Sequence, residues 1–337
     1  MHFVVSVGPI LLSWLTALTM RGVHAESILS KSYFRNEKKL KNNEKDDHRK
    51  LSLLGGWDET NCELKNVENH LVEPIHVVSY PGSGGRFLLT SIEALTGIKV
   101  IGDGHLNAVS DPPPKPFNYL AYFSQEMAYG NYFSKVVILM RTPLKVIPSF
   151  CDILYQKTSN ETESDNYAQC PEDVWLKFRD ERFEDELRRW KYTLEYWLDR
   201  YDPAHRLMIS YERLTDDYVG PLETLRLARF LNTTYSVETH APEDVACVWT
   251  KISTNNDLRE TRPHGDETAR FTISQLNRMT EVLDELVVKY LDMDFVDLFY
   301  DYEKFIDRLR IKMIGEELSL AEKYLPQFIT RMIEDND

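Results

Sequence analysis

A glycine-rich loop is the stretch of this sequence whose residue types point most directly to chemistry. Residues 80–85 read Tyr-Pro-Gly-Ser-Gly-Gly, and Arg86 follows them. The β-branched residues of segment 75–78 predict a buried strand before the loop, and the leucine spacing of residues 86–95 favours a helix after it. Glycines let a backbone approach an anion closely, and the first N–H groups of a helix point at it. The pattern therefore predicts an anion-binding loop, with an ordinary strand-to-helix connection as the structural alternative.

Two nucleotide-binding motifs are absent from this loop. A Walker A loop requires G-x-x-x-x-G-K-[ST], and no lysine follows these glycines. The spacing G-x-G-x-x-G of dinucleotide-binding folds is not present either. Both absences argue against a nucleoside-triphosphate kinase and a dinucleotide-dependent dehydrogenase.

A second strand–turn–helix unit places an arginine where ligands bind in open α/β sheets. Residues 134–140 form the most continuous apolar run, which is typical of a central parallel strand. The run stops at Arg141, and Pro143 is suited to the first position of a helix. Arg141 is therefore expected at the carboxyl end of a strand, the edge at which α/β sheets bind ligands. The alternative is that Arg141 forms a structural ion pair at the end of the strand and binds no ligand.

The remaining segments alternate between short apolar runs and longer amphipathic stretches, which predicts an α/β fold. Further strands are expected at 97–102 and 206–211. Helices are expected at 117–132, 174–201, 221–231, 242–252, 274–291 and 300–335.

Composition limits the partners of the chain. It has 337 residues and a formal net charge of −14. An acidic protein is not suited to nonspecific nucleic-acid binding, so no nucleic-acid partner is expected. A local basic pocket for an anionic ligand remains compatible with this charge.

The N-terminus has the character of a targeting segment. Residues 3–20 are almost wholly apolar, and small residues precede Glu26 at the positions that a signal peptidase requires. We expect residues 1–25 to be a cleaved signal peptide, with a signal anchor as the alternative, and only the anchor would attach the protein to a membrane. Residues 26–60 are polar and charged and are interpreted as a flexible stem. Both a cleaved signal peptide and a signal anchor predict that the folded domain lies in the Golgi lumen or is secreted.

Cysteines and glycosylation sequons agree with that compartment. Two sequons begin at Asn160 and Asn232. An even number of cysteines in a lumenal protein suggests two disulfides, for which three connectivities exist. The pair Cys151–Cys170 is favoured because it would close a polar loop, and four buried thiols are the alternative. No cysteine or histidine spacing indicates a metal site. The cysteines are Cys62, Cys151, Cys170 and Cys247.

Four segments, in order, resemble the sulfotransferases that use 3′-phosphoadenosine 5′-phosphosulfate (PAPS). Residues 80–87 are similar to the family's 5′-phosphosulfate loop, in the P-G-S-G form of Golgi and WSC-domain-type members. Residues 136–149 resemble its 3′-phosphate segment, an arginine at a strand end followed eight residues later by a serine. Residues 209–214 resemble its R-Y-E-D-L motif, and residues 262–275 loosely resemble its nucleotide loop and the helix after it.

The resemblance implies a fold and a co-substrate. It implies a P-loop-like sulfotransferase fold, in which a central parallel sheet lies between two helical layers. We expect this domain to cover residues 61–300, followed by a C-terminal helical extension at 301–337. PAPS would be the sulfuryl donor, and the chemistry requires no metal.

The resemblance also implies a role for each matching residue. The 5′-phosphosulfate would be held by Ser83, Gly84, Gly85 and Arg86, and Phe87 stands where the family has an adenine-stacking tryptophan. Arg141 and Ser149 would bind the 3′-phosphate, since a dianion suits a bidentate guanidinium and a hydroxyl donor. Tyr211 would lie near the adenine. Arg262, His264 and Gly265 would close over the 3′-phosphate.

Sulfuryl transfer needs a cation near the leaving oxygen and a base for the acceptor proton. The family's usual lysine or arginine of the loop is replaced by Gly82 here, so Arg86 is the expected substitute. His105 is the first candidate for the base because its ordinary pKa suits the task, although a histidine of a surface loop is the structural alternative. Asp103 is the second candidate and Glu93 the third.

The acceptor is expected to be a hydroxyl group of a glycan or a protein. Three other functions stay open at this point: a noncatalytic member that binds nucleotide, a divergent P-loop kinase, and a structural secreted domain. The sequence makes no prediction about oligomeric state.

Overall fold

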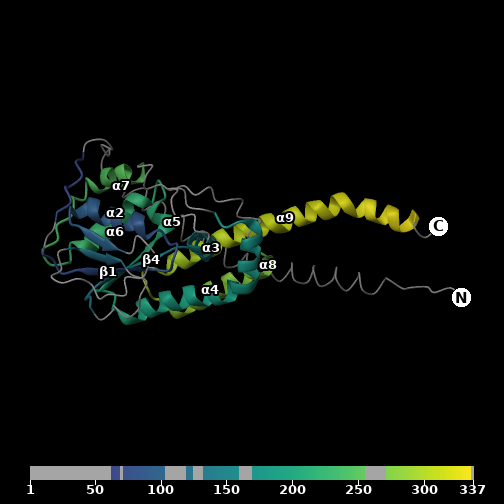
Figure 1. Ribbon diagram of the computed structural model, residues 1–337, viewed down its shortest axis with the longest axis horizontal. Helices are drawn as coiled ribbons and strands as arrows, with labels where there is room; N and C mark the ends of the chain where they lie inside the picture. Colours follow the sequence, from purple (N-terminus) through teal and green to yellow (C-terminus); the bar gives the residue numbers. More distant parts are fainter. Residues whose placement is uncertain are drawn as a thin grey trace. The chain divides into compact units, whose positions relative to one another are not determined.

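A five-stranded sheet with all strands parallel forms the centre of the computed structural model (Figure 1). The structure describes residues 62–68, 71–102, 119–123, 132–158, 169–254 and 271–334, with side chains up to residue 315. The strand order is β2 (Val100–Gly102), β3 (Ala121–Phe123), β1 (Ile75–Ser79), β4 (Val136–Met140) and β5 (Arg206–Ser210). The α/β fold with a central parallel sheet is confirmed.

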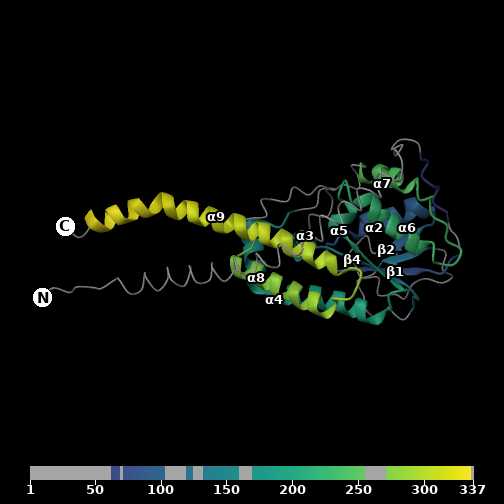
Figure 2. The ribbon, with the colours of Figure 1, turned by 180° about the vertical axis from the view of Figure 1, so that it is seen from behind.

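Helices cover both faces of the sheet, as the alternation of side chains along β4 requires. Val136, Ile138 and Met140 belong to a core with α3 (Pro143–Thr158), α4 (Glu172–Arg200), α8 (Ile273–Lys289) and α9 (Val296–Glu334). Val137 and Leu139 face the other core, with α2 (Gly85–Thr96), α5 (Tyr211–Leu214), α6 (Gly220–Leu231) and α7 (Val245–Ser253). The two layers are seen on either side of the strands in Figure 2 as well. The three-layer arrangement is therefore confirmed.

The helix expected over residues 117–132 is wrong where the structure describes that segment. Ala121–Phe123 is a strand that pairs with β1 on one side and β2 on the other. All three of its residues are buried, so it shows no alternation of polar and apolar side chains. A short apolar run of this kind cannot be assigned to strand or helix by periodicity.

The start of α9 belongs to the core of the domain. Tyr302 and Ile306 are almost fully buried, and the Tyr302 hydroxyl lies 3.0 Å from Ser210 Oγ and 3.3 Å from the Met140 carbonyl oxygen. Those two contacts attach α9 to the carboxyl ends of β4 and β5. The boundary expected at residue 301 therefore falls inside one continuous helix.

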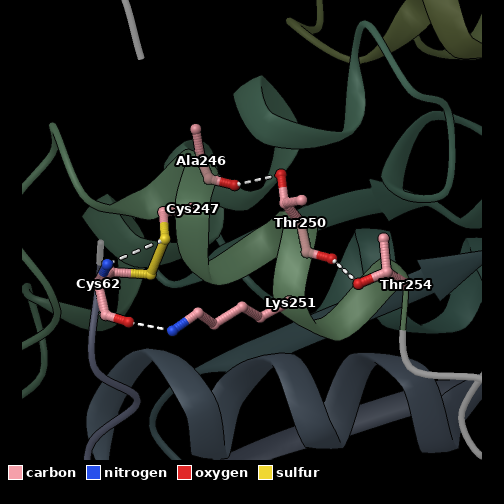
Figure 3. Close-up of a disulfide and its surroundings, with 6 residues drawn as sticks. All are labelled: Cys62, Ala246, Cys247, Thr250, Lys251 and Thr254. Carbon is pink, nitrogen blue, oxygen red and sulfur yellow. Dashed lines mark hydrogen bonds between the residues drawn. A yellow bond between two sulfur atoms is a disulfide. The ribbon is translucent and has the colours of Figure 1, made fainter. Parts of the chain in front are cut away.

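Two disulfides join the cysteines. Cys151 pairs with Cys170, as expected, and Cys62 pairs with Cys247. The second bond connects the segment before β1 to α7, and the Cys62 N–H donates to Cys247 Sγ over 3.2 Å (Figure 3). Lys251 on the next turn of α7 donates to the Cys62 carbonyl oxygen. The segment that precedes the sheet is thus fixed to the α2-side layer.

No helix in the described part of the chain is both long and apolar enough to span a bilayer. The expected signal segment (1–25) and stem (26–60) lie outside the described residues.

A buried histidine in β1 predicts an unusual dependence of stability on pH. His76 is fully buried among Phe133, Tyr122 and Trp197, and neither ring nitrogen has a hydrogen-bond partner among the described residues. Burial, with a smaller contribution from Arg200, lowers the pKa of His76 to about 3. The folded state therefore holds the neutral ring. Because the unfolded state takes up a proton at His76 and the folded state does not, the free energy of unfolding is highest above the ordinary histidine pKa of 6.5. It falls as the pH is lowered from 6.5 toward 3.

Replacing His76 by leucine is expected to raise the free energy of unfolding at pH 7 by about 1–2 kcal/mol, because an unpaired buried polar group is removed. The advantage of the variant should grow as the pH is lowered to 4. Chemical denaturation at several pH values measures both effects. His205→Gln, at a half-exposed site, is the control and should stay within about 0.5 kcal/mol of wild type. A leucine variant less stable than wild type at pH 5 would contradict the interpretation.

Candidate functional site

The glycine-rich loop connects β1 to α2 and has two residues in the left-handed region. Gly82 has φ +85° and Gly84, the residue that caps α2, has φ +90°. Other residues are strained at such angles. A Cβ on Gly84 would also lie 2.2 Å from Cε2 of Tyr211. Glycine is therefore required at position 84 by both backbone conformation and close packing, and α2 begins directly beside the Tyr211 ring.

Arg141 joins the loop to the Tyr211 ring. Its Nη1 donates to the Gly82 carbonyl oxygen over 2.9 Å, and its guanidinium carbon lies 4.8 Å from the centroid of the Tyr211 ring. The residue is 7% exposed, and Trp190 Nε1 donates to its carbonyl oxygen over 3.1 Å. Three segments far apart in the sequence thus meet at the carboxyl end of the sheet, with a cation at the junction.

Ser149 lies against the same loop from α3. A Cβ on Gly82 would be 3.0 Å from both Cβ and Oγ of Ser149 and 3.4 Å from the Val146 carbonyl oxygen. The predicted neighbourhood of Arg141, Ser149 and the loop is therefore present. A side chain at position 82 would be directed at α3, and the positive φ of this residue would add backbone strain to such a substitution.

Lys145 is a residue that the sequence analysis did not identify. It lies in the first turn of α3, four residues before Ser149, so the two side chains are neighbours on one helix face. Because Ser149 contacts the loop, this face is the one that α3 turns toward Gly82. The spacing of four from Ser149 was the signal available in the sequence.

Ser83 is placed differently from the expectation. Its side chain is 1% exposed, and its Oγ has no hydrogen-bond partner among the described residues. It lines a small cavity of about 10 Å³ with Trp190 and Leu194 of α4. Its N–H donates to the Tyr80 carbonyl oxygen over 3.2 Å within the turn. The hydroxyl thus faces the α4-side core, and the groups of the loop suited to an anion are the N–H groups that begin α2.

The two aromatic rings expected near adenine differ in accessibility. Phe87 is buried, whereas Tyr211 is partly exposed. Their ring centroids are 6.4 Å apart in an edge-on arrangement. Gly85 is packed against a third ring, since a Cβ there would lie 2.6 Å from Cζ of Phe123. Tyr211 is therefore the more accessible surface for a flat ligand.

Two carboxylates hold the loop and the strand ends in place. The Tyr80 hydroxyl donates to Glu186 Oε2 over 2.6 Å, and Arg182 donates to Glu186 Oε1 over 3.0 Å. Burial and then the Glu186 contact raise the pKa of Tyr80 far above its ordinary value, so the phenol stays protonated. Glu212 accepts a hydrogen bond of 3.0 Å from the Thr142 N–H. The glutamate of the third motif thus connects the strand ends of β5 and β4.

The remaining candidates lie either outside the described residues or away from this site. Asp103, His105, Arg262, His264 and Gly265 lie outside the described residues. Glu93 is at the far end of α2, eight residues or about 12 Å along the helix axis from Gly85. Its Oε1 accepts a hydrogen bond of 3.0 Å from the Val100 N–H, so it stabilises the start of β2. Among the described residues, no group of side chains could hold a metal ion.

Comparison with known proteins gives a distant likeness. No protein-family model matches the chain, and no curated protein sequence matches it. Among solved structures, the chain is similar to a crystal structure of mouse sulfotransferase SULT7A1 complexed with PAP, with a TM-score of 0.44 and 17% sequence identity. The alignment covers 76% of this chain and 93% of that chain.

Proposed function

We propose that this protein is a sulfotransferase that transfers a sulfuryl group from PAPS to a hydroxyl group of a glycan or a protein. The observation that carries the proposal is the position of the Arg141 guanidinium, 2.9 Å from the Gly82 carbonyl oxygen and 4.8 Å from the Tyr211 ring centroid. Three of the four segments that resemble the PAPS-dependent family contribute to that contact. In α/β sheets this edge is where ligands bind.

Each part of the nucleotide has a chemically matched neighbour in the site. Arginine binds a phosphate through two parallel N–H donors, so Arg141 with the Ser149 hydroxyl suits the 3′-phosphate. The first N–H groups of α2, after Gly84, suit the 5′-phosphosulfate because they carry the positive end of the helix dipole. The Tyr211 ring offers a surface for the adenine. A cation–π contact holds the guanidinium over that ring.

The chemistry of transfer consists of positioning and of charge stabilisation. The acceptor oxygen approaches the sulfur in line with the leaving phosphate oxygen, and negative charge builds on the leaving group. A cation that faces this oxygen stabilises the transition state more than the ground state. Gly82 cannot supply it. Arg86, exposed on the first turn of α2, is our candidate, with Lys145 of α3 as the second one.

Replacing Arg86 by alanine is expected to lower kcat by about 100-fold, the usual cost of one transition-state donor. Binding of adenosine 3′,5′-bisphosphate should change little, because that product lacks the transferred group. Comparing kcat of Lys145→Ala with kcat of Arg86→Ala shows which of the two cations acts on the leaving oxygen. Single-turnover transfer of labelled sulfate measures the effect. Full turnover in both single variants and in the double variant would contradict the assignment.

His105 remains our candidate for the base, with Asp103 as the second. His105→Ala is expected to lower kcat by about 10²- to 10⁴-fold, the usual contribution of a general base. The acidic limb of the pH–rate profile should disappear with it, since that limb reports the protonation of the base. Asp103→Asn is the matched comparison. A His105→Ala enzyme with the wild-type profile would remove His105 from the mechanism.

The secretory pathway is the proposed location. Two disulfides support it, because such bonds persist in oxidising compartments and are rare in the cytosol. The apolar residues 3–20 would direct the chain there. Fractionation of cells that express the full chain, with and without residues 1–25, tests the location. Equal retention of both forms in the cytosol would contradict it.

A noncatalytic nucleotide-binding protein is a second candidate, and one observation favours it. The loop lacks the family's cation at Gly82, and the space next to Gly82 is taken by Ser149. Binding of adenosine 3′,5′-bisphosphate without transfer to any hydroxyl acceptor would identify this case.

A further inference from the structure

An asparagine at the end of α6 lies in a position suited to a covalently attached sugar. Asn232 caps the C-terminus of α6, is exposed, and begins the sequon Asn232-Thr233-Thr234. Its Oδ1 accepts a hydrogen bond of 2.9 Å from the Thr239 N–H. Among the described residues, none accepts a hydrogen bond from its Nδ2, the atom to which an N-linked sugar is attached. The carboxamide is thus oriented through its oxygen, and its nitrogen is left for substitution.

A polar hollow lies directly beside this side chain. Its volume is about 590 Å³, and Asn232 itself forms part of the wall together with Lys65, Thr96, Ser236 and Glu238. Hydroxyl, ammonium and carboxylate groups are the partners that sugar hydroxyls and acetamido groups bind. The Lys65 ammonium is held in place by a hydrogen bond of 2.9 Å to the Glu238 carbonyl oxygen. Thr96 is the last residue of α2, about 17 Å along the helix from Gly85, so the hollow is separate from the candidate nucleotide site.

The third residue of the sequon shows when such a sugar would have to be added. Thr234 is 4% exposed, and its Oγ1 lies 3.4 Å from the ammonium of Lys135, which also donates to Thr233 Oγ1 over 2.8 Å. Lys135, which directly precedes β4, is itself buried. The hydroxyl that the sequon requires is therefore covered in the folded protein. Attachment has to take place before this turn folds, as it does on a chain that is entering the secretory pathway.

We propose that Asn232 carries an N-linked glycan whose first N-acetylglucosamine residues lie in this hollow. In the attachment step Nδ2 loses a proton and forms a bond to C1 of the sugar. The bond from C1 to the diphosphate of a lipid-linked oligosaccharide breaks, and the diphosphate leaves with the electron pair. The cell's glycosylation machinery supplies that donor. The proposal rests on the secretory route of the proposed function and is independent of sulfate transfer.

The test uses the full chain expressed in a eukaryotic secretory cell line, with Asn232→Asp as the decisive variant. Aspartate keeps the oxygen that accepts from Thr239 and removes the nitrogen, so it separates glycosylation from folding. Asn160→Asp is the matched control at the other sequon. Peptide mass spectrometry of the wild type should find a glycan at Asn232, removable by peptide N-glycosidase. An unmodified Asn232 in the recovered protein overturns the proposal, whatever the sulfotransferase activity of that protein.

Occupancy of the hollow has a separate readout. Enzymatic removal of the glycan converts Asn232 to aspartate, so the treated protein has the sequence of the Asn232→Asp variant, and that variant is the reference for the effect of the new carboxylate. Measured on Asn160→Asp protein, treatment should lower Tm by about 2–4 °C, which corresponds to the loss of a few contacts in a domain of this size. Glu238→Ala should make the shift smaller. An unchanged Tm after complete removal overturns the placement of the glycan in the hollow.

Discussion

Replacing Arg141 by alanine is expected to abolish the stabilisation of the protein by adenosine 3′,5′-bisphosphate. Hydrogen bonds from a charged donor contribute about 1.5–3 kcal/mol each, so the dissociation constant should rise at least about 100-fold. The variant also loses the bond to the Gly82 carbonyl oxygen and the contact with the Tyr211 ring, which fix the loop. Wild-type protein should melt at a higher temperature when the ligand is present, by mass action, and the variant should not. Differential scanning fluorimetry over a range of ligand concentrations measures the effect.

Two further variants distinguish the loss of the binding site from general damage to the fold. Arg141→Lys keeps the charge but not the planar pair of donors, and it should bind with intermediate affinity. Arg188→Ala removes an exposed arginine of α4 that pairs with Asp185, and it should respond to the ligand like wild type. An Arg141→Ala protein that folds and keeps the full ligand-induced shift would contradict the role of Arg141.

Substituting Gly84 by alanine is expected to be the most destabilising single change in the loop. The residue has φ +90°, and the new Cβ would lie 2.2 Å from the Tyr211 ring. Backbone strain and overpacking each cost about 1–3 kcal/mol, so the free energy of unfolding should fall by about 2–6 kcal/mol. Nucleotide binding should be lost with it, because either the helix start or the ring has to move.

A double variant divides that cost between its two causes. Tyr211→Ala removes the ring, so in the double variant with Gly84→Ala only the backbone strain remains. The two substitutions should therefore be less destabilising together than the sum of their single effects by about 1–3 kcal/mol. Gly315→Ala is the control, since nothing lies within 4 Å of a Cβ there and α9 is helical at that point. It should stabilise the protein by about 0.5–1 kcal/mol. Additive effects at positions 84 and 211 would show that the ring does not restrict the loop.

Much of the fold follows from local patterns in the sequence. The apolar runs that precede Tyr80 and Arg141 each fill a strand buried on both faces, and such runs are readable without a structure. β3 was not predictable in this way, because its three residues are ordered by the strands on either side of them. His76 was not predictable either. A polar residue in a strand suggests an exposed face, yet this one is covered by Trp197 from α4.

The candidate site was predictable in its parts and not in their arrangement. The spacing of Arg141 and Ser149 indicated a phosphate-binding pair, and both residues lie against the predicted loop. The inward direction of the Ser83 hydroxyl depends on the packing of α4, more than 100 residues later in the chain. The bond from Tyr80 to Glu186 spans 106 residues, and the one from Thr142 to Glu212 spans 70. Contacts at such separations leave no local signal in the sequence.

Calorimetric titration of the full chain with adenosine 3′,5′-bisphosphate and with adenosine 5′-monophosphate tests the central claim most directly. The two ligands differ only by the 3′-phosphate, the group that Arg141 and Ser149 are proposed to bind. The bisphosphate should bind at least about 100-fold more tightly, a difference of about 2.7 kcal/mol. Equal affinities, or no binding of the bisphosphate, would contradict a PAPS site at the end of this sheet.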